Sequence, residues 1–239
     1  MSESLQRRLV RQASASYRPA GPWAWHFARG KLARDPVFAA LLRPGLLPAT
    51  GRYLDLGCGQ GLLASWLRAA TALHAGHDWP AEQPAPPRIS AYHGLDMQAT
   101  AIRHARQALA DCDFPTRLDL GDLRDFALPD ADVITLFDVL HYLPGTAQES
   151  LLQRIRDSLP PDGRLLLRVG DGAAGLPHHL SRVVDSLVVR LQGGTWPRLH
   201  CRPATAWLGL LGELGFRVEP FPPMAGAGFA NVLLRARPI

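Results

Sequence analysis

Glycines and an aspartate lie close together in the stretch Tyr53 to Leu63, which reads YLDLGCGQGLL. A short apolar run contains Asp55, glycines follow at 57, 59 and 61, and an apolar helical pattern begins at Leu62. Glycine lets the main chain come close to a ligand where a side chain would block it. The stretch therefore predicts a nucleotide-type site at a turn from a strand to a helix.

The glycine spacing does not fit the two common phosphate sites. A dinucleotide fingerprint needs its third glycine at position 62, which is leucine, and no Gly-Lys-Ser/Thr ending of a phosphate loop follows. The spacing therefore does not indicate a pyrophosphate cradle.

This stretch resembles the first motif of class I S-adenosylmethionine-dependent methyltransferases, in which an acidic residue ends a strand before a Gly-x-Gly-x-Gly turn. The matching cofactor-binding residues are Asp55, Gly57, Cys58, Gly59 and Gly61. The resemblance implies S-adenosylmethionine as cofactor, S-adenosylhomocysteine as product and in-line displacement as mechanism. It covers about residues 50–170 and, more loosely, 215–234.

A ribose-binding acid is expected where the second strand ends, about 20 residues past the first glycine. Asp78 has the nominal spacing. Asp96 lies further along, but it closes an apolar run and precedes a helical pattern whose text, Ala-Ile-x-x-Ala-Arg, resembles the second motif of the family. We favour Asp96 over Asp78, which makes 71–90 an inserted loop and places Met97 against the adenine.

Two later stretches extend the resemblance. The Gly-Asp-Leu step at Asp122 and Leu123 is similar to the third motif, where a carboxylate accepts a hydrogen bond from the adenine amine. Asp122 also suits a local turn, which it would cap. Residues 132–143 look like the fourth strand and its exit loop, which implies that Phe137 and Asp138 face the methionine part of the cofactor.

A base is needed if the methyl acceptor is a hydroxyl, a thiol or a ring carbon, and histidine suits this role because its pKa lies near neutrality. His141, in the exit loop, is the first catalytic candidate, with side-chain packing as the alternative role. Tyr17 is the second candidate. Weaker candidates are Tyr142, His178, His179 and His200. We expect no metal site, because no cluster of side chains has metal-ligand spacing.

Apolar runs alternate with helical patterns from Arg52 to Arg168, which is typical of βαβ units. We predict an α/β fold, with a doubly wound, Rossmann-like sheet of seven strands that is mostly parallel and has an antiparallel last strand. The strands are expected at 53–56, 89–95, 117–120, 133–137, 164–169, 216–221 and 229–236. The helices are expected at 62–72, 99–110, 147–159, 179–191 and 204–215.

We assign residues 1–48 to an N-terminal helical cap and 49–239 to the methyltransferase core, with a lid segment at 171–202. The cap has helical patterns over 5–13 and 23–42, and Pro36 should break or restart the second. Its arginines are interleaved with tryptophan and tyrosine, which suits an acidic partner and, less well, nucleic acid.

Composition restricts the class of protein. The 239 residues are 47% hydrophobic and 20% charged, as in one globular domain, and no apolar run is long enough to span a membrane. The three scattered cysteines form no disulfide framework, which predicts a reducing, cytoplasmic compartment. The formal charge of +5 comes almost wholly from arginine and predicts a surface that attracts anions.

These patterns together predict methyl transfer to a small molecule or to a carrier-tethered acyl or aryl group. The second acceptor class comes from a fainter likeness of residues 27–32 and 35–38 to methyltransferases of bacterial fatty-acid-like and aryl-polyene pigment pathways. An RNA methyltransferase is one alternative, although DVLH at 138–141 replaces the Asn/Asp-Pro-Pro-Tyr motif of many base-amine methylating enzymes. A non-catalytic, cofactor-binding partner subunit is the other.

Overall fold

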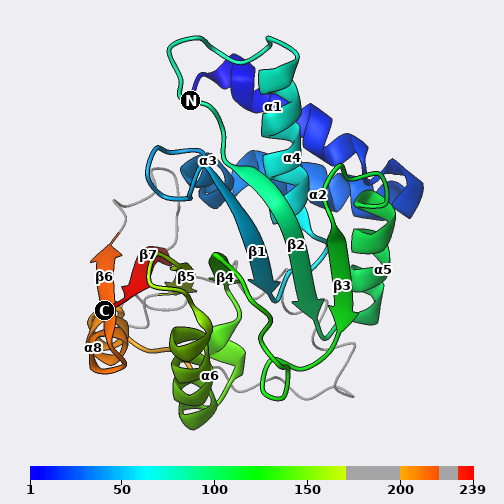
Figure 1. Cartoon of the computed structure of the whole chain (residues 1–239). Coiled ribbons are helices and arrows are strands. Elements are labelled where there is room, and N and C mark those ends of the chain that lie inside the picture. The colour runs from blue at the N-terminus through cyan, green and yellow to red at the C-terminus, as the bar shows by residue number, and fades with distance from the viewer. Residues whose placement is uncertain (171–199, 221–230) are drawn as a thin grey trace.

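The computed structural model describes residues 1–170, 200–220 and 231–239. Seven strands form one sheet in the order β3-β2-β1-β4-β5-β7-β6 (Figure 1). The strands are β1 (Thr50–Leu56), β2 (Arg88–Asp96), β3 (Thr116–Leu120), β4 (Val133–Phe137), β5 (Arg164–Gly170), β6 (Phe216–Pro220) and β7 (Asn231–Pro238). β7 runs antiparallel to β5 and β6, whereas the pairs among β1 to β5 are parallel. The predicted α/β fold with an antiparallel last strand is confirmed.

Helices connect the strands and precede the sheet. They are α1 (Glu3–Ala15), α2 (Pro22–Arg34), α3 (Pro36–Leu41), α4 (Leu62–Ala75), α5 (Ala99–Ala108), α6 (Gly145–Ser158) and α8 (Ala204–Glu213), with short 3₁₀ turns η1 (Arg18–Ala20) and η2 (Leu140–Tyr142). α4 continues beyond its predicted end at residue 72 and stops before Gly76, so the irregular segment before β2 is 76–87. The helix predicted at 179–191 and most of the predicted lid lie outside the described residues.

Pro36 separates α2 from α3, as the sequence predicts. α2 ends at Arg34, and the carboxylate of Asp35 accepts a hydrogen bond from Val37 N at 3.0 Å. Proline is suited to the first position of a helix, because its missing N–H would have no partner there. Asp35 is therefore the cap that restarts the chain as α3.

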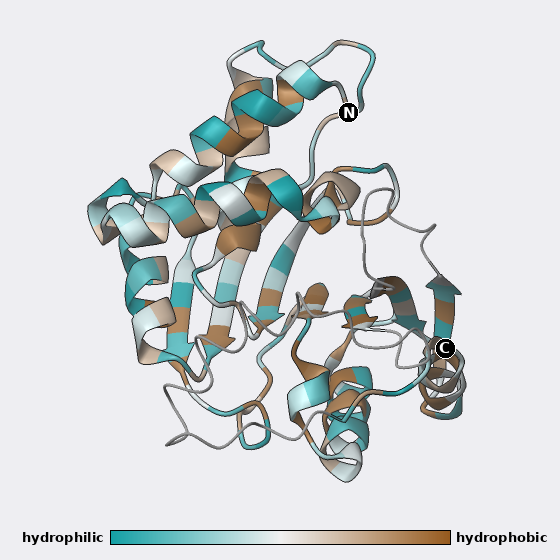
Figure 2. Cartoon of the chain, turned by 180° about the vertical axis from the view of Figure 1, so that it is seen from behind, coloured by the Kyte–Doolittle hydropathy of each residue, from teal (hydrophilic) through white to brown (hydrophobic). Residues whose placement is uncertain are grey.

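Hydrophobic clusters lie on both faces of the sheet. The first contains buried residues of the helices α1 to α5, among them Leu9, Leu32 and Trp66, and the second contains residues of α6 and α8, among them Leu152 and Trp207. Burying each such side chain contributes about 1.5–3 kcal/mol. Hydrophilic and hydrophobic residues alternate along the N-terminal helices (Figure 2). These helices therefore share the first core with the sheet, whereas their assignment to a separate cap remains a prediction.

The parallel register decides where polar residues meet. β1 pairs with β2 on one side and with β4 on the other, so the loops after these three strands leave from one edge of the sheet. The carboxyl edge of the strands is therefore where we place the candidate site.

Among the described residues, no helix is both long enough and apolar enough to cross a bilayer.

Candidate functional site

The turn after β1 has the backbone geometry that requires glycine. Gly57, Gly59 and Gly61 have φ angles of +81°, +54° and +74°, which side chains disfavour. A Cβ atom at Gly57 would clash with Cγ2 of Val139, whereas one at Gly59 would meet nothing within 4 Å. Gly57 therefore lets the turn pack against the loop after β4, and Gly59 leaves main chain open to a ligand.

Asp96 lies beside this turn. One oxygen of its carboxylate accepts a hydrogen bond from Gly59 N at 2.8 Å and the other accepts one from Gln98 N at 2.8 Å. Burial raises the pKa of this carboxyl, while the backbone donors oppose the rise. Asp78 instead forms an ion pair with Arg8 and is largely exposed. The structure thus brings Asp96, and not Asp78, to the glycine turn, and Met97 next to it is 66% exposed.

Asp55 is buried within the sheet behind the turn. Its carboxylate accepts hydrogen bonds from the hydroxyls of Tyr92 and Thr135, both at 2.7 Å. Burial raises its pKa to about 6 in spite of these two donors, and the charge of Asp96 adds to the rise. Cys58 is buried as well. Both carboxylate oxygens of Asp55 are therefore engaged by side chains of the neighbouring strands.

Asp122 caps a local turn at the end of β3. Its carboxylate accepts a hydrogen bond from Arg124 N at 2.9 Å and forms an ion pair with the same guanidinium, and these bonds lower the pKa of Asp122. The side chain of Arg154 donates to the carbonyls of Leu123 and Arg124 at 3.3 Å and 2.7 Å. The loop is therefore fixed by its own side chains and by α6.

Asp138 follows β4 in a strained conformation, with a φ angle of +59°. The guanidinium of Arg168 holds its carboxylate with Nε at 2.9 Å and with a second, shorter hydrogen bond. Arg168 also donates to Asp35 at 2.5 Å, and Lys31 pairs with the other oxygen of Asp35 at 2.9 Å. The ring of Phe137 lies 5.7 Å from the Arg168 guanidinium carbon. These contacts connect the start of α3 with the loop after β4.

The two acids of this group, Asp35 and Asp138, are paired with two basic side chains, Lys31 and Arg168. Burial raises the pKa of the Asp35 carboxyl, but Arg168 and Lys31 more than offset this and lower it to about 2. Burial lowers the pKa of Arg168, and Asp138 and Asp35 reverse the effect. Asp35 and Arg168 are therefore both charged at neutral pH.

His141 lies in η2, directly after this loop. The side chain is 9% exposed, and its Nε2 atom is buried without a hydrogen-bond partner. Burial lowers its pKa, which the charge of Asp138 partly opposes, so the imidazole is neutral near pH 7. The buried amide of Gln148 fixes the main chain around it by donating to the carbonyls of Leu140, Leu143 and His200.

Tyr17 connects the N-terminal region to the glycine turn. Its ring is fully buried, its hydroxyl donates to Gln60 O at 2.9 Å, and the same oxygen lies 3.0 Å from the hydroxyl of Ser65. Burial raises the pKa of Tyr17. These contacts hold the hydroxyl of Tyr17 against the main chain of the glycine turn. The weaker candidates His178 and His179 lie outside the described residues.

Sequence reasoning missed Arg168, Asp35 and Gln148. A signal for the first was present, because Arg168 is the lone charge within the apolar strand text LLLRV, and a charge in a buried strand needs a partner. The Asp-Pro step at 35–36 indicated a helix cap but not the ion pair across the fold. Gln148 carries no such signal in its surrounding text.

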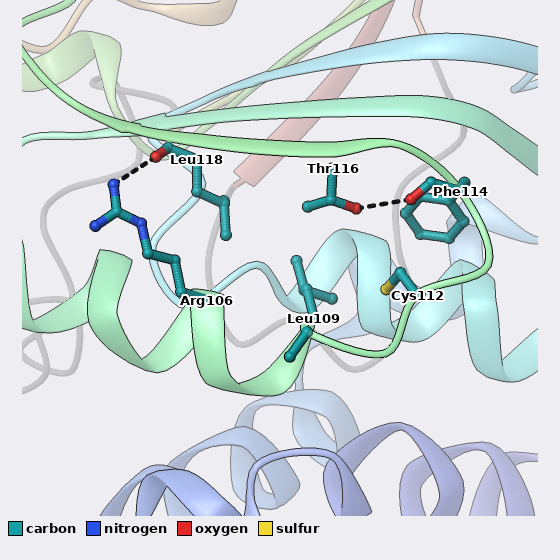
Figure 3. Close-up of a pocket in the computed structure, with 7 residues that line it drawn as sticks. Arg106, Leu109, Cys112, Phe114, Thr116 and Leu118 are labelled. Atoms are coloured by element: carbon teal, nitrogen blue, oxygen red, sulfur yellow. Dashed lines mark hydrogen bonds between the residues drawn. The ribbon is translucent and has the colours of Figure 1, made fainter.

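A pocket of about 290 Å³ lies away from this edge, between α5 and β3 (Figure 3). Thr116 at the start of β3 lines it, together with Cys112, Phe114 and Leu109. Leu109 also packs near the α-carbon of Gly61. Within the described ranges, no three His, Cys, Asp or Glu side chains gather where they could hold a metal ion.

Residues 54–165 match the family described as a methyltransferase domain. This span starts in β1 and ends in β5, so it contains the glycine turn, Asp96, Asp122 and the loop that carries His141. The chain carries a class I methyltransferase domain. S-adenosylmethionine is the cofactor of this class, and S-adenosylhomocysteine is its product.

Comparisons with single proteins agree with the methyltransferase family. The chain is 29% identical over 166 residues to trans-aconitate 2-methyltransferase of Klebsiella pneumoniae, which covers 70% of this chain and 56% of that protein. The chain therefore spans little more than half the length of this relative.

Solved structures share the fold of this methyltransferase domain. The pyocyanin biosynthetic protein PhzM aligns with a TM-score of 0.60 and 22% identity, over 94% of this chain and 61% of that one. Magnesium protoporphyrin IX methyltransferase of Synechocystis PCC 6803, solved with bound S-adenosylhomocysteine, aligns with a TM-score of 0.57 and 20% identity, over 92% and 89%.

Proposed function

We propose that this protein transfers a methyl group from S-adenosylmethionine to a small-molecule acceptor. The observation that carries the proposal is the open main chain at Gly59 beside the carboxylate of Asp96. A ligand can approach the backbone there, and the Asp96 carboxylate, whose oxygens accept backbone hydrogen bonds, keeps lone pairs for ribose hydroxyls. The residues at this edge therefore fit a nucleoside.

The rest of the cofactor would extend along the same edge. Asp122 would accept from the adenine amine, with Met97 and Leu123 beside the ring. Gly57, Gly61 and Cys58 would shape the turn, while Phe137, Asp138 and the buried charge of Asp55 would border the methionine part. The bound cofactor supplies an electrophilic methyl group on a sulfonium. The protein residues need only hold the acceptor within about 3–3.5 Å of that methyl group and exclude water.

His141 is the residue that we propose as base. A neutral imidazole with a free Nε2 can accept the proton of an acceptor hydroxyl, and its lowered pKa keeps it unprotonated at neutral pH. Tyr17 was the other candidate. Its hydroxyl is engaged by Gln60 and Ser65, so we propose that it positions the glycine turn and takes no part in proton transfer.

Two acceptor classes are proposed for testing. The name of the Klebsiella pneumoniae relative makes a small carboxylate the first acceptor to test. A carrier-tethered acyl or aryl group is the second class, since the basic N-terminal helices suit an acidic carrier. Three free cysteines, Cys58, Cys112 and Cys201, fit the predicted reducing cytoplasm.

Calorimetric titration with S-adenosylhomocysteine, followed by a methyl-transfer assay, tests the proposal. We expect binding, and turnover with at least one member of an acceptor panel that contains carboxylates, phenols, acyl carriers and total RNA. Turnover on RNA alone would favour the RNA methyltransferase alternative. Binding without turnover would favour the non-catalytic partner subunit, and folded protein that binds no S-adenosylhomocysteine would refute the proposal.

A further inference from the structure

The strands β5, β7 and β6 lie next to one another at one end of the sheet (Figure 1), and their register places several arginines on one face. Arg217 of β6 pairs in register with Arg237 of β7. Arg164 begins β5 and lies one residue beyond the register pair Leu165 and Ala236, which places it opposite Arg237. Directly opposed residues of neighbouring strands point to the same face. Three arginines therefore form a row across three strands.

A fourth arginine joins the row. Arg235 is two residues from Arg237 on β7 and so shares its face. Arg164 donates a hydrogen bond from Nη1 to the carbonyl of Gly45 at 3.0 Å, and Arg235 donates from Nη1 to the same oxygen. Two guanidinium groups thus converge on one carbonyl. Among the described residues, Glu219 alone forms an ion pair with this row, through Arg235.

Buried donors in this cluster lack acceptors. The Nε atoms of Arg164 and Arg237 are buried without a hydrogen-bond partner, as is the hydroxyl of Tyr53. Tyr53 pairs with Val133, which pairs with Arg164, so the tyrosine lies on the same face. A buried donor without an acceptor typically costs about 1–3 kcal/mol. The cluster therefore has the donors of a binding site and lacks the acceptor.

Like charges also repel within the cluster. Burial lowers the pKa of Arg164, and the charges of Arg237 and Arg235 lower it further, while Tyr53 and Asp162 partly oppose this. Burial and Arg237 likewise lower the pKa of Arg235. An anion held between these guanidinium groups would relieve the repulsion.

We propose that Arg164, Arg235, Arg237 and Tyr53, here called the arginine site, bind a phosphate-type oxyanion. A planar guanidinium donates pairs of hydrogen bonds that match phosphate oxygens, and a tyrosine hydroxyl adds a further donor. The arginine site lies at the amino end of β5, whereas the glycine turn leaves the carboxyl end of β1 in the same parallel sheet. It is therefore separate from the cofactor and acceptor, and it does not depend on the proposed function.

Thermal unfolding of the whole chain with added anions tests this proposal. Inorganic phosphate at ten times its dissociation constant should raise Tm by about 3–6 °C over sodium chloride of equal ionic strength. Arg237→Gln should lose this response and keep the wild-type affinity for S-adenosylhomocysteine. Arg52→Gln is the matched control, because Arg52 already pairs with Asp132 at the same end of the sheet. It should keep the phosphate response.

Two further additives define the anion. A larger shift with glycerol phosphate, which carries no nucleoside, than with inorganic phosphate would identify a phosphate ester as the ligand, and equal shifts would identify free phosphate. The proposal fails if phosphate and chloride act alike, or if phosphate stabilises Arg237→Gln as much as the wild type. It also fails if polyglutamate raises Tm and phosphate does not, which would make the arginines a docking surface for an acidic protein.

Discussion

Arg168 in β5 and Asp138 at the end of β4 are joined by two hydrogen bonds, and Arg168 is 4% exposed. The same guanidinium reaches Asp35 at the start of α3. Asp138 precedes Val139, which packs against Gly57 of the turn. A buried arginine thus connects the N-terminal helices with the loop that borders the proposed methionine site.

Arg168→Met should destabilise the fold and weaken cofactor binding. Removing one partner of a buried ion pair leaves unpaired charges, which typically lowers the free energy of unfolding by about 3–5 kcal/mol. The loop at Asp138 would also lose its anchor, so affinity for S-adenosylhomocysteine should fall. Urea unfolding and calorimetry measure the two effects. Arg52→Met, which breaks an exposed pair with Asp132, should change stability less and leave affinity unchanged.

Asp96→Ala should weaken binding of S-adenosylhomocysteine by about 1.5–3 kcal/mol, because a charged hydrogen bond to ribose is lost. Asp78→Ala is the control, since Asp78 pairs with Arg8 at the surface. Calorimetric titration of both variants decides between the two acids. Unchanged affinity in Asp96→Ala would disprove the ribose role.

Gly57→Ala and Gly59→Ala should behave differently. The new methyl group at 57 would clash with Val139, and alanine disfavours the φ angle that the backbone has there. The free energy of unfolding should therefore fall together with cofactor affinity. At 59 the methyl group meets open space, so affinity should fall with a smaller loss of stability. Denaturant titrations and calorimetry compare the variants. Equal losses of stability would contradict the open cradle at Gly59.

Asp55 should make stability fall as pH rises from about 4 to 6. Its folded pKa of about 6 lies above the unfolded value of 3.8, so the folded state binds more protons in this window. The shift corresponds to a loss on the order of 3 kcal/mol in the free energy of unfolding. Urea titrations at several pH values should show a flatter profile for Asp55→Asn. Asp130→Asn, at an exposed side chain, should keep the wild-type profile.

His141→Asn should lower kcat at least about 100-fold if His141 is the base, because general-base catalysis contributes 10²–10⁴-fold. Affinity for S-adenosylhomocysteine should change little. Tyr17→Phe should lower stability and affinity and leave the pH profile of kcat unchanged, since its hydroxyl binds Gln60. A lost alkaline or acidic limb of the pH profile in Tyr17→Phe would return Tyr17 to the catalytic candidates.

Local sequence patterns predicted the fold and the position of the glycine turn well. Short apolar strands, the glycine turn and the Pro36 break depend on neighbouring residues, and each lies where the sequence predicts it. Asp96, Asp122 and Asp138 also lie at one edge of the sheet, as the predicted strand pattern implies, because parallel strands end together. Element ends were less well predicted: α4 is longer at its end and β1 begins earlier than the pattern indicated.

Contacts between distant residues were not predictable in this way. The pairing of Asp35 with Arg168 joins residues far apart in the chain, and no local pattern encodes it. The burial of Tyr17 against Gln60 likewise depends on how α1 packs on α4. Both contacts belong to tertiary packing, which sequence periodicity describes only as an apolar face.

The position of β7 has a consequence for synthesis of the chain. β5 is hydrogen-bonded to β4 on one side and to β7 on the other, and β7 also lies between β5 and β6. While the ribosome is still making the residues before Asn231, the apolar edge of β5 has no strand to pair with. An open edge of this kind invites pairing with other chains. Nascent chains truncated before residue 231 should therefore aggregate or recruit chaperones more readily than the full chain.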